Sequence, residues 1–225
     1  MIFFSTWLDK SLTYSCGIFN SSKETLEQAQ INKYNKIINM VKPRTGDKVL
    51  EIGCGWGGFA VHLAKKYDVK LDCITISKKQ FFFTKERIRK EKLNHRVNVK
   101  MMDYRDLKNK YDIIVSIEMI EAVGEKYLDK YFNIIKENLA SGGRGAIQAI
   151  VIKDELYNRY RMKEDFIQKY IFPGGFLPSI KSLNKISNKS GLKIEEYHSY
   201  GTHYSNTLNK WRESFLNSWD DISRQ

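Results

Sequence analysis

The sequence predicts an α/β fold with a doubly wound, mostly parallel sheet and helices on both faces. From about residue 26 to residue 152, short apolar segments alternate with amphipathic helical segments, which is typical of parallel strands joined by helical crossovers. The apolar segment 49–52 runs directly into a glycine-rich turn, as strands do at the ligand-binding edge of such sheets. The 225 residues contain neither a proline-rich linker nor a repeat, so we expect one domain, 1–225.

The elements follow one another in a regular order. The first helix is expected after Ser21-Ser22-Lys23-Glu24, which matches a capping box, and before Pro43. The next elements are a strand to Ile52, a helix over 59–67, a strand over 70–76, a helix from a second capping box at 77–80 to about 93, strands over 96–102 and 112–117, a helix over 126–139 closed by Gly142-Gly143, and a strand over 144–152. Beyond these we expect helices around a loop at 172–175, a strand over 192–200 and a last helix from about Asn206.

Composition limits the partners that the chain can have. The net charge of +12, from 38 basic and 26 acidic residues, permits attraction to nucleic acid or to anionic lipid, although a general abundance of lysine explains it as well. Acids interrupt the densest basic stretch, 85–92, so we expect no nucleic-acid partner. Cys16, Cys54 and Cys73 lack metal-ligand spacing, and no apolar stretch approaches the roughly 20 residues that span a bilayer. We therefore expect a cytoplasmic protein without a bound metal.

The glycine run at 49–58 indicates a nucleotide-like cofactor. Glycines at the end of a strand let a ligand lie against bare peptide at the amino end of the next helix. The run fits the E-x-G-x-G-x-G pattern of S-adenosylmethionine (AdoMet) enzymes through Glu51, Gly53, Gly55 and Gly57, and also fits the G-x-G-x-x-G pattern of dinucleotide enzymes through Gly53, Gly55 and Gly58.

Two observations favour AdoMet over a dinucleotide. The indole of Trp56 would crowd a pyrophosphate inside the turn. The next strand ends in Thr75-Ile76-Ser77 and not in the acid that binds a ribose, while Asp72 lies in mid-strand. The sequence therefore predicts AdoMet as the cofactor.

With these elements assigned, the chain resembles the cyclopropane fatty acid synthase family of AdoMet-dependent methyltransferases along nearly its whole length. The matching segments are 12–19 (Leu-Thr-Tyr-Ser-Cys-Gly-Ile-Phe), the glycine run, 74–80, 116–124 (Ser-Ile-Glu-Met-Ile-Glu-Ala-Val-Gly), 171–179 and 203–208. The resemblance implies the class I methyltransferase fold and transfer of a methyl group to the cis double bond of a phospholipid-bound acyl chain, giving a cyclopropane or methyl-branched chain. It further implies work at an anionic membrane surface on the cytoplasmic face of the inner membrane.

The resemblance also implies site residues. In the family a bound bicarbonate accepts a proton, and the matching residues here are Glu121, Tyr204 and the backbone at Cys16. Gln148 stands where the family tends to have histidine, so an amide would bind the anion without carrying a proton. The cofactor-binding residues are expected to be Tyr14, Ser15, Glu51, Gly53, Gly55, Gly57, Thr75, Gln80, Asp103 and Tyr104.

Structural explanations compete for several of these residues. Gln80 follows Ser77 by three positions, as a capping box requires, and Thr75 is a β-branched strand residue. Asp103 and Tyr104 could form an ordinary turn, whereas Glu121 lies in an apolar stretch where a carboxylate is costly without a function.

The ends of the chain depart from the family pattern. We expect 1–20 to cover the cofactor and 153–190 to be a helical insertion on the substrate side, and we find no segment after Trp219 for the antiparallel strand that usually ends this fold. Two alternatives therefore stay open. One is a methyltransferase for a small substrate, for which Glu121 would be dispensable, and the other is a non-catalytic remnant that binds AdoMet or lipid.

Overall fold

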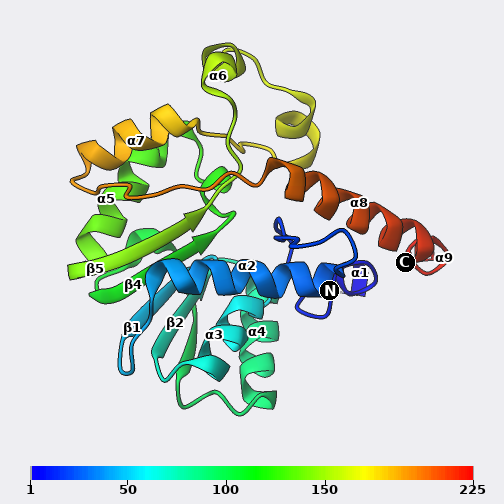
Figure 1. The fold of residues 1–225 in the computed structure, drawn as a ribbon, viewed down its shortest axis with the longest axis horizontal. Coiled ribbons are helices and arrows are strands. Elements are labelled where there is room, and N and C mark those ends of the chain that lie inside the picture. The colour runs from blue at the N-terminus through cyan, green and yellow to red at the C-terminus, as the bar shows by residue number, and fades with distance from the viewer. Residues whose placement is uncertain (1, 225) are drawn as a thin grey trace.

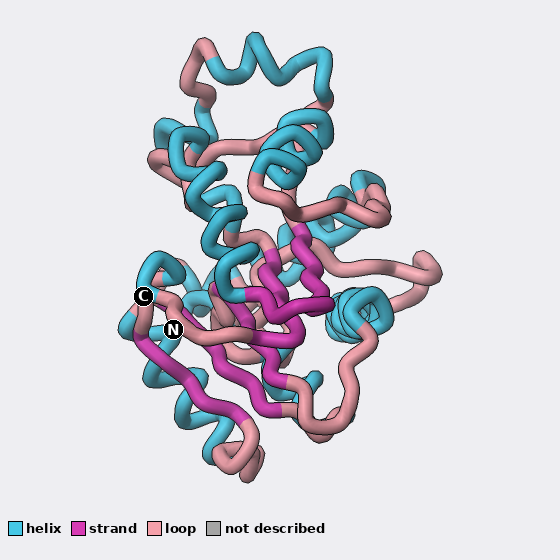
Figure 2. The backbone as a smooth tube through the Cα atoms, turned by 90° about the vertical axis from the view of Figure 1, so that its left-hand side faces the viewer, coloured by secondary structure: helices cyan, strands magenta, loops and turns pink. Residues whose placement is uncertain are grey.

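The computed structural model describes residues 2–224 and contains one sheet of five parallel strands in the order β3-β2-β1-β4-β5 (Figures 1 and 2). The strands are β1 (Lys48–Ile52), β2 (Lys70–Thr75), β3 (Val97–Met101), β4 (Tyr111–Ile117) and β5 (Leu139–Gln148). The predicted doubly wound α/β fold is confirmed, and within residues 2–224 no antiparallel strand joins the sheet.

Helices cover both faces of the sheet. They are α1 (Ile2–Ser5), α2 (Leu26–Val41), α3 (Gly58–Lys66), α4 (Lys78–Lys90), α5 (Leu128–Asn138), α6 (Asp154–Arg161), α7 (Ile180–Lys189), α8 (Gly201–Asn217) and α9 (Trp219–Ile222), with a π turn at Ile167–Ile171. On one face, α2, α3 and α4 pack against Val49, Leu71 and Val97. On the other face, α5 and α7 pack against Leu50 and Ile52. Because side chains alternate along a strand, Glu51 shares the face of Val49 and is directed toward α2 and α3.

The strand order places a crevice between β1 and β4. After β1 the chain forms β2 and β3 on one side, and then returns to pair β4 with the other side of β1, with Ile52 opposite Ser116. The connections therefore leave the sheet on opposite faces at this point, and ligands of open α/β sheets bind in the crevice so formed at the carboxyl ends of the strands.

A third apolar cluster joins the two ends of the chain beside this crevice. The indoles of Trp7 and Trp211 lie 6.0 Å apart, and Ser218 donates a hydrogen bond to the Thr6 carbonyl. Arg87 of α4 donates to the carbonyls of Lys10 and Ser11, which attaches the N-terminal segment to the sheet domain. Figure 1 accordingly shows the N-terminal segment and α8 on the same side of the molecule.

Several predicted boundaries are wrong for local reasons. The cap of α2 is Thr25, which forms the capping box with Gln28, while the carboxylate of Glu24 accepts from Asn20 instead. Helix α5 ends at Asn138 without help from Gly142 and Gly143, because β5 already begins at Leu139 and takes up the glycines where its register to β4 shifts.

The C-terminal part contains a second error. Residues 192–200 are described without helix or strand, with exposure that alternates only as far as residue 195, and α8 begins at Gly201, not near residue 206. In the described part of the chain, no helix has the length and apolar character needed to cross a bilayer.

Candidate active site

The glycine turn after β1 exposes bare backbone at one position. Gly53, Gly55 and Gly57 all have positive φ, of 79°, 53° and 80°. A Cβ at Gly53 would lie 2.7 Å from Met119, and a Cβ at Gly57 would lie 2.7 Å from Thr84, so packing requires glycine at both. A Cβ at Gly55 would meet no atom within 4 Å. The turn therefore presents its open face at Gly55, beside the amino end of α3, and this face fits AdoMet.

Trp56 lies on the outer side of this turn. Its indole is buried against Phe4 and Phe83, at centroid distances of 6.0 and 5.4 Å. The ring thus stabilises the wall of the turn from outside, so steric crowding by this indole does not explain why AdoMet would be preferred to a dinucleotide.

Thr75 and Gln80 form a polar pair at the carboxyl end of β2. The Thr75 hydroxyl donates to Gln80 Oε1 at 2.8 Å, and Ser77 Oγ accepts from the Gln80 backbone. Ser77 therefore caps α4, but the Gln80 side chain does not complete a capping box. Within residues 2–224 the amide nitrogen of Gln80 has no partner, which leaves it able to donate to a ligand.

Asp103 and Tyr104 follow β3, farther along the same edge of the sheet. Both carboxylate oxygens of Asp103 accept from the Arg105 guanidinium, at 2.9 and 2.6 Å, and these hydrogen bonds lower the pKa of Asp103. The Tyr104 ring packs edge-on against Tyr131 at 5.3 Å. Asp103 and Tyr104 thus form the ordinary turn that the sequence offered as the alternative to a cofactor-binding role.

Glu51 lies beneath the turn and not on its open face. Its side chain is 3 % exposed, and Cys73 Sγ lies 3.5 Å from its carboxylate as a donor. Burial raises the pKa of Glu51 to about 8. Among the predicted cofactor residues, Glu51 is therefore placed to support the turn from the α2 side of the sheet.

The segment at residues 14–16 is fixed by α2. Ser15 is buried, with its hydroxyl accepting from Lys33 Nζ at 2.6 Å and its carbonyl accepting from Gln30 Nε2 at 2.8 Å. The Tyr14 ring is half exposed and lies 5.0 Å from the Trp211 indole. Burial raises the pKa of the Cys16 thiol to about 11, so the thiol stays protonated and Cys16 acts in the site through its backbone.

Glu118, which sequence reasoning missed as a site residue, is the acceptor at the centre of the site. Its Oε1 accepts from the Cys16 backbone N–H and from Gln148 Nε2, both at 2.8 Å. Its backbone has φ of +46°, a left-handed conformation that costs a side chain such as glutamate about 1–3 kcal/mol. A strained residue with a buried, doubly hydrogen-bonded carboxylate at the β1/β4 crevice indicates a functional group.

Lys33 is the buried positive charge that faces Glu118 and Glu51. Its side chain is 0 % exposed, and burial lowers the pKa of the ammonium to about 8 although Glu118 favours the charged form. For Glu118 the balance is reversed, because burial raises its pKa while Lys33 and the hydrogen bonds from Cys16 and Gln148 oppose the rise. Lys33 thus offsets part of the cost that burial places on the charged form of Glu118.

Glu121 and Tyr204 face the same site. Glu121 Oε1 accepts from the Ile150 backbone at 2.5 Å, while its other oxygen is buried and has no hydrogen-bond partner among residues 2–224, and burial raises the pKa of this carboxyl to about 7. Burial and then the negative charge of Glu118 raise the pKa of Tyr204, with a further contribution from Glu121. The structure thus brings together all four predicted catalytic residues, Cys16, Glu121, Gln148 and Tyr204, and adds Glu118.

Bicarbonate, which the family resemblance implies, does not fit this arrangement. The Cys16 N–H donates to Glu118, the Gln148 amide donates to Glu118 and to the Cys16 carbonyl, and the Ile150 N–H donates to Glu121. Each of these donors therefore already has an acceptor within the protein. Two carboxyl groups at the site also disfavour a third anion.

The sequence carried signals for both missed residues. Glu118 is an acid that directly follows the apolar strand at 111–117, in the same place relative to β4 that the glycine turn has relative to β1. Lys33 interrupts the apolar face of a helix, between Ala29, Tyr34 and Ile37, where a charge has to find a buried partner.

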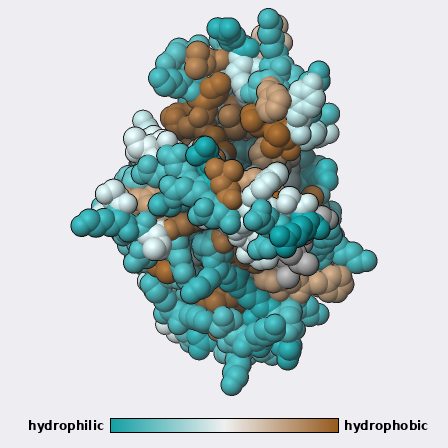
Figure 3. All heavy atoms as spheres, turned by 90° about the vertical axis from the view of Figure 1, so that its right-hand side faces the viewer, coloured by the Kyte–Doolittle hydropathy of each residue, from teal (hydrophilic) through white to brown (hydrophobic). Residues whose placement is uncertain are grey.

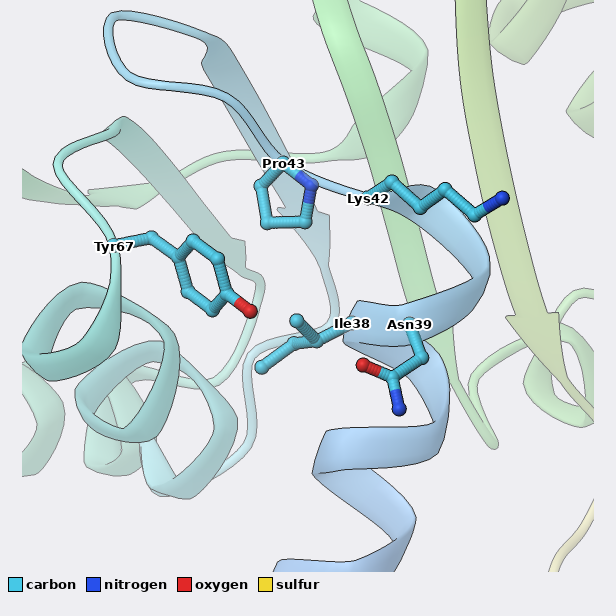
Figure 4. Close-up of a pocket in the computed structure, with 5 residues that line it drawn as sticks. All are labelled: Ile38, Asn39, Lys42, Pro43 and Tyr67. Carbon is cyan, nitrogen blue, oxygen red and sulfur yellow. The ribbon is translucent and has the colours of Figure 1, made fainter.

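A surface pocket lies away from this site. It has a volume of about 390 Å³ and is lined by Ile38, Asn39, Lys42, Pro43 and Tyr67, with the Tyr67 hydroxyl directed toward Ile38 (Figure 4). Four of these residues lie at the end of α2, before β1, and Tyr67 lies between α3 and β2, so the pocket is at the amino ends of the strands, opposite the glycine turn.

Comparisons with known proteins identify the family and the fold. The sequence profile described as mycolic acid cyclopropane synthetase matches residues 2–225. The chain is 38 % identical over 220 residues to the cyclopropane-fatty-acyl-phospholipid synthase of Escherichia coli K12, covering 98 % of this chain and 55 % of that protein. It is 35 % identical over 228 residues to the tuberculostearic acid methyltransferase UfaA1 of Mycobacterium tuberculosis, covering 98 % and 53 %. The chain thus spans about half the length of these curated relatives.

Solved structures with the same fold are similar over most of their length. The cyclopropane synthase MmaA2 from Mycobacterium tuberculosis superposes with a TM-score of 0.90 at 26 % identity, covering 98 % of this chain and 80 % of that one. The mycolic acid cyclopropane synthase CmaA1, solved with SAH and CTAB, gives a TM-score of 0.89 at 27 % identity, covering 98 % and 81 %.

Proposed function

Because the chain belongs to the mycolic acid cyclopropane synthetase family, we propose that the protein transfers the methyl group of AdoMet to a carbon–carbon double bond of an unsaturated acyl chain. One observation carries this proposal above the others. The bare backbone at Gly55 and the buried acids Glu118 and Glu121 belong to neighbouring strands and meet at the same crevice.

The residues that would hold AdoMet lie around the glycine turn. Gly55 offers bare peptide, the amide nitrogen of Gln80 is able to donate, and the N-terminal segment that ends at Tyr14 would close over the ligand. Bound there, AdoMet supplies an electrophilic methyl group. We assign the cofactor-covering role to 1–20, within a single domain.

The acids and the tyrosine suit chemistry on an alkene. An alkene is a weak nucleophile and becomes positively charged when it takes up a methyl group, so the site has to exclude water and stabilise a cation. In its ionised form, which Lys33 favours, Glu118 would place a negative charge in a water-poor site, where fixed charges act more strongly than in water. The raised pKa keeps the Tyr204 phenol protonated, so it can donate a hydrogen bond but not compete as a base.

An exposed apolar surface supports a substrate held in a membrane. It comprises α6, the π turn and the chain between them, with exposed Leu156, Met162, Phe166, Ile167, Tyr170, Ile171 and Phe172. We call it the 156–172 surface. Figure 3 shows apolar side chains gathered in the upper part of the molecule, where Figure 1 places α6. Lys163 and Lys169 lie within it, and lysines near anionic head groups contribute about 1 kcal/mol each. We propose that this surface docks on anionic phospholipid at the inner membrane face.

Labelled lipid vesicles test the proposed function. The protein is incubated with methyl-labelled AdoMet and vesicles of phosphatidylglycerol with cis-unsaturated chains, and the acyl chains are analysed by mass spectrometry. We expect label in the lipid and a gain of one CH2 unit per modified chain. Vesicles with saturated chains provide the control and should take up no label. Equal labelling of both lipids, or none in either, would contradict the proposal, and fragmentation of the product distinguishes a ring from a branch.

A further inference from the structure

We infer that Glu118 is the proton acceptor of the reaction and stands in the place of the bicarbonate that the family resemblance implies. The inference rests on the proposed function, because it names the group that removes the proton after methyl transfer. It makes a distinct claim, namely that this protein carries its acceptor as a side chain and works without dissolved bicarbonate.

Two hydrogen-bond donors of the site bind the same oxygen of Glu118. The Cys16 N–H and the Gln148 amide converge on one point from two separate segments, and Glu118 Oε1 occupies that point at 2.8 Å from each. The second hydrogen of the Gln148 amide donates to the Cys16 carbonyl at 3.2 Å, which fixes the orientation of the amide. A glutamine suits this task, because it donates to a carboxylate at every pH.

One carboxylate oxygen remains available. Both donors bind Oε1, and among residues 2–224 no hydrogen bond to Oε2 is found. Oε1 therefore anchors the group while Oε2 can take up a proton. By contrast, Glu121 Oε1 accepts from the backbone of Ile150 and not from Cys16 or Gln148.

Glu118 lies next to the glycine turn that follows β1. Glu118 directly follows β4, and the next residue, Met119, is the one that a Cβ on Gly53 would touch at 2.7 Å. The carboxylate is thus attached to the wall of the glycine turn, at the crevice where the methyl group would arrive. Its positive φ turns the side chain back over the strand end toward Cys16, and the buried Lys33 offsets its charge.

The proposed step balances as follows. The double bond supplies two electrons to form a bond with the transferred methyl carbon, and the carbon–sulfur bond of AdoMet breaks with its electrons left on sulfur. The resulting cation then loses one proton from the added carbon to Glu118 Oε2. The electrons of that C–H bond close the third side of the ring, and the protonated carboxyl later releases the proton to solvent.

Two substitutions separate this role from folding. Glu118→Gln keeps an oxygen that accepts from Cys16 and Gln148 but removes the basic carboxylate. Glu118→Gly relieves the positive φ and opens the donors to a small anion. Glu137→Gln, an exposed acid on α5, serves as the control. Each protein is assayed on unsaturated vesicles in carbonate-free buffer and again with added bicarbonate, and binding of 13C-labelled bicarbonate is followed by NMR without AdoMet or lipid.

The inference predicts a specific pattern. The unsubstituted protein and Glu137→Gln should have the same rate with and without bicarbonate and should bind none of it. Glu118→Gln should lose at least a hundredfold in rate in both buffers, whereas Glu118→Gly should bind labelled bicarbonate and recover at least tenfold in rate when it is added. Dependence of the unsubstituted protein on bicarbonate, or full activity of Glu118→Gln, would overturn the inference while leaving the proposed function intact. If no protein labels lipid, the proposed function fails, and the NMR binding pattern still tests the site.

Discussion

Two acids three residues apart, Glu118 and Glu121, have different environments at the end of β4. Glu118 has two donors and a nearby ammonium, whereas in the described part of the chain Glu121 has one backbone donor and a buried oxygen without a partner. The motif identifies Glu121 as a site residue, and the structure does bring it to the site. The sequence marks Glu118 only as an acid that directly follows β4, because its partners Cys16 and Gln148 lie 102 and 30 residues away and only the fold brings them to it.

The first prediction concerns Gly55, whose backbone forms the open face of the glycine turn. Gly55→Ala places a methyl group on the open face of the turn, so we expect the affinity for AdoMet to fall at least tenfold. The positive φ of 53° should also cost about 1–2 kcal/mol of stability. Titration calorimetry with AdoMet and denaturant unfolding measure the two effects separately.

Gly46→Ala is the matched control for this substitution. Gly46 also has positive φ, of 87°, and a Cβ added there would meet no atom within 4 Å. It precedes β1, however, and so lies at the amino ends of the strands, away from the glycine turn. We expect a similar loss of stability with unchanged affinity. If both variants bind AdoMet as the unsubstituted protein does, the turn is not the cofactor site.

At the scale of elements, two helices fix the Tyr14–Phe19 segment over the crevice. Gln30 and Lys33 of α2 donate hydrogen bonds to Ser15 in this segment, and α8 binds two of its backbone N–H groups. Thr207 of α8 accepts from the Gly17 backbone at 3.0 Å, and His203 Nδ1 accepts from the Phe19 backbone at 3.1 Å. His203, which adjoins Tyr204 in the matching segment 203–208, therefore helps to position α8.

The second prediction concerns this attachment. Thr207 is fully buried, and Thr207→Val leaves the Gly17 N–H without an acceptor, so we expect the free energy of unfolding to fall by about 1–3 kcal/mol. Thr207→Ser retains the hydroxyl and loses one methyl group, which should cost only about 1 kcal/mol. Urea unfolding of the two variants compares the hydroxyl with the methyl. Equal destabilisation by both would mean that packing, and not the hydrogen bond, attaches α8.

The elements that the sequence predicts well are those with two local signals. The helices α2 to α5 and the first four strands combine an apolar period with a cap, a proline or a turn, and they appear within a few residues of their expected places, whereas β5 lies at 139–148 and not at 144–152. The segment 192–200 had only the alternating pattern, and it is not a strand because no strand edge pairs with it in the described chain. Pairing is a tertiary property, so local sequence could not decide it.

At the scale of the whole molecule, exposed apolar side chains are concentrated at the opposite end from α4. The 156–172 surface includes Phe166 at 66 % exposure, whereas α4 carries a single comparable ring, Phe82, at 57 %. Figure 1 places α6 and α4 at opposite ends of the view. If the 156–172 surface meets the membrane, these two rings should respond differently to a polar substitution.

The third prediction uses this pair. Phe166→Ser should weaken binding to phosphatidylglycerol vesicles roughly tenfold, because about 1–2 kcal/mol of apolar transfer is lost. Phe82→Ser should leave binding unchanged, and added salt should weaken binding of both variants. Co-sedimentation with vesicles provides the measurement. Equal effects of the two substitutions would show that the membrane meets another face.

The contact between the N-terminal segment and α8 affects the order in which parts of the protein fold. The contact between Trp7 and Trp211 links residues about two hundred positions apart, and the intervening residues build the entire sheet. Contacts of such long sequence separation form late, since the cost of closing the loop comes before any gain. On the ribosome the sheet and its glycine turn can assemble while the first helix still lacks its partner. The covering over the site is therefore completed only after the sheet, once α8 has been synthesised.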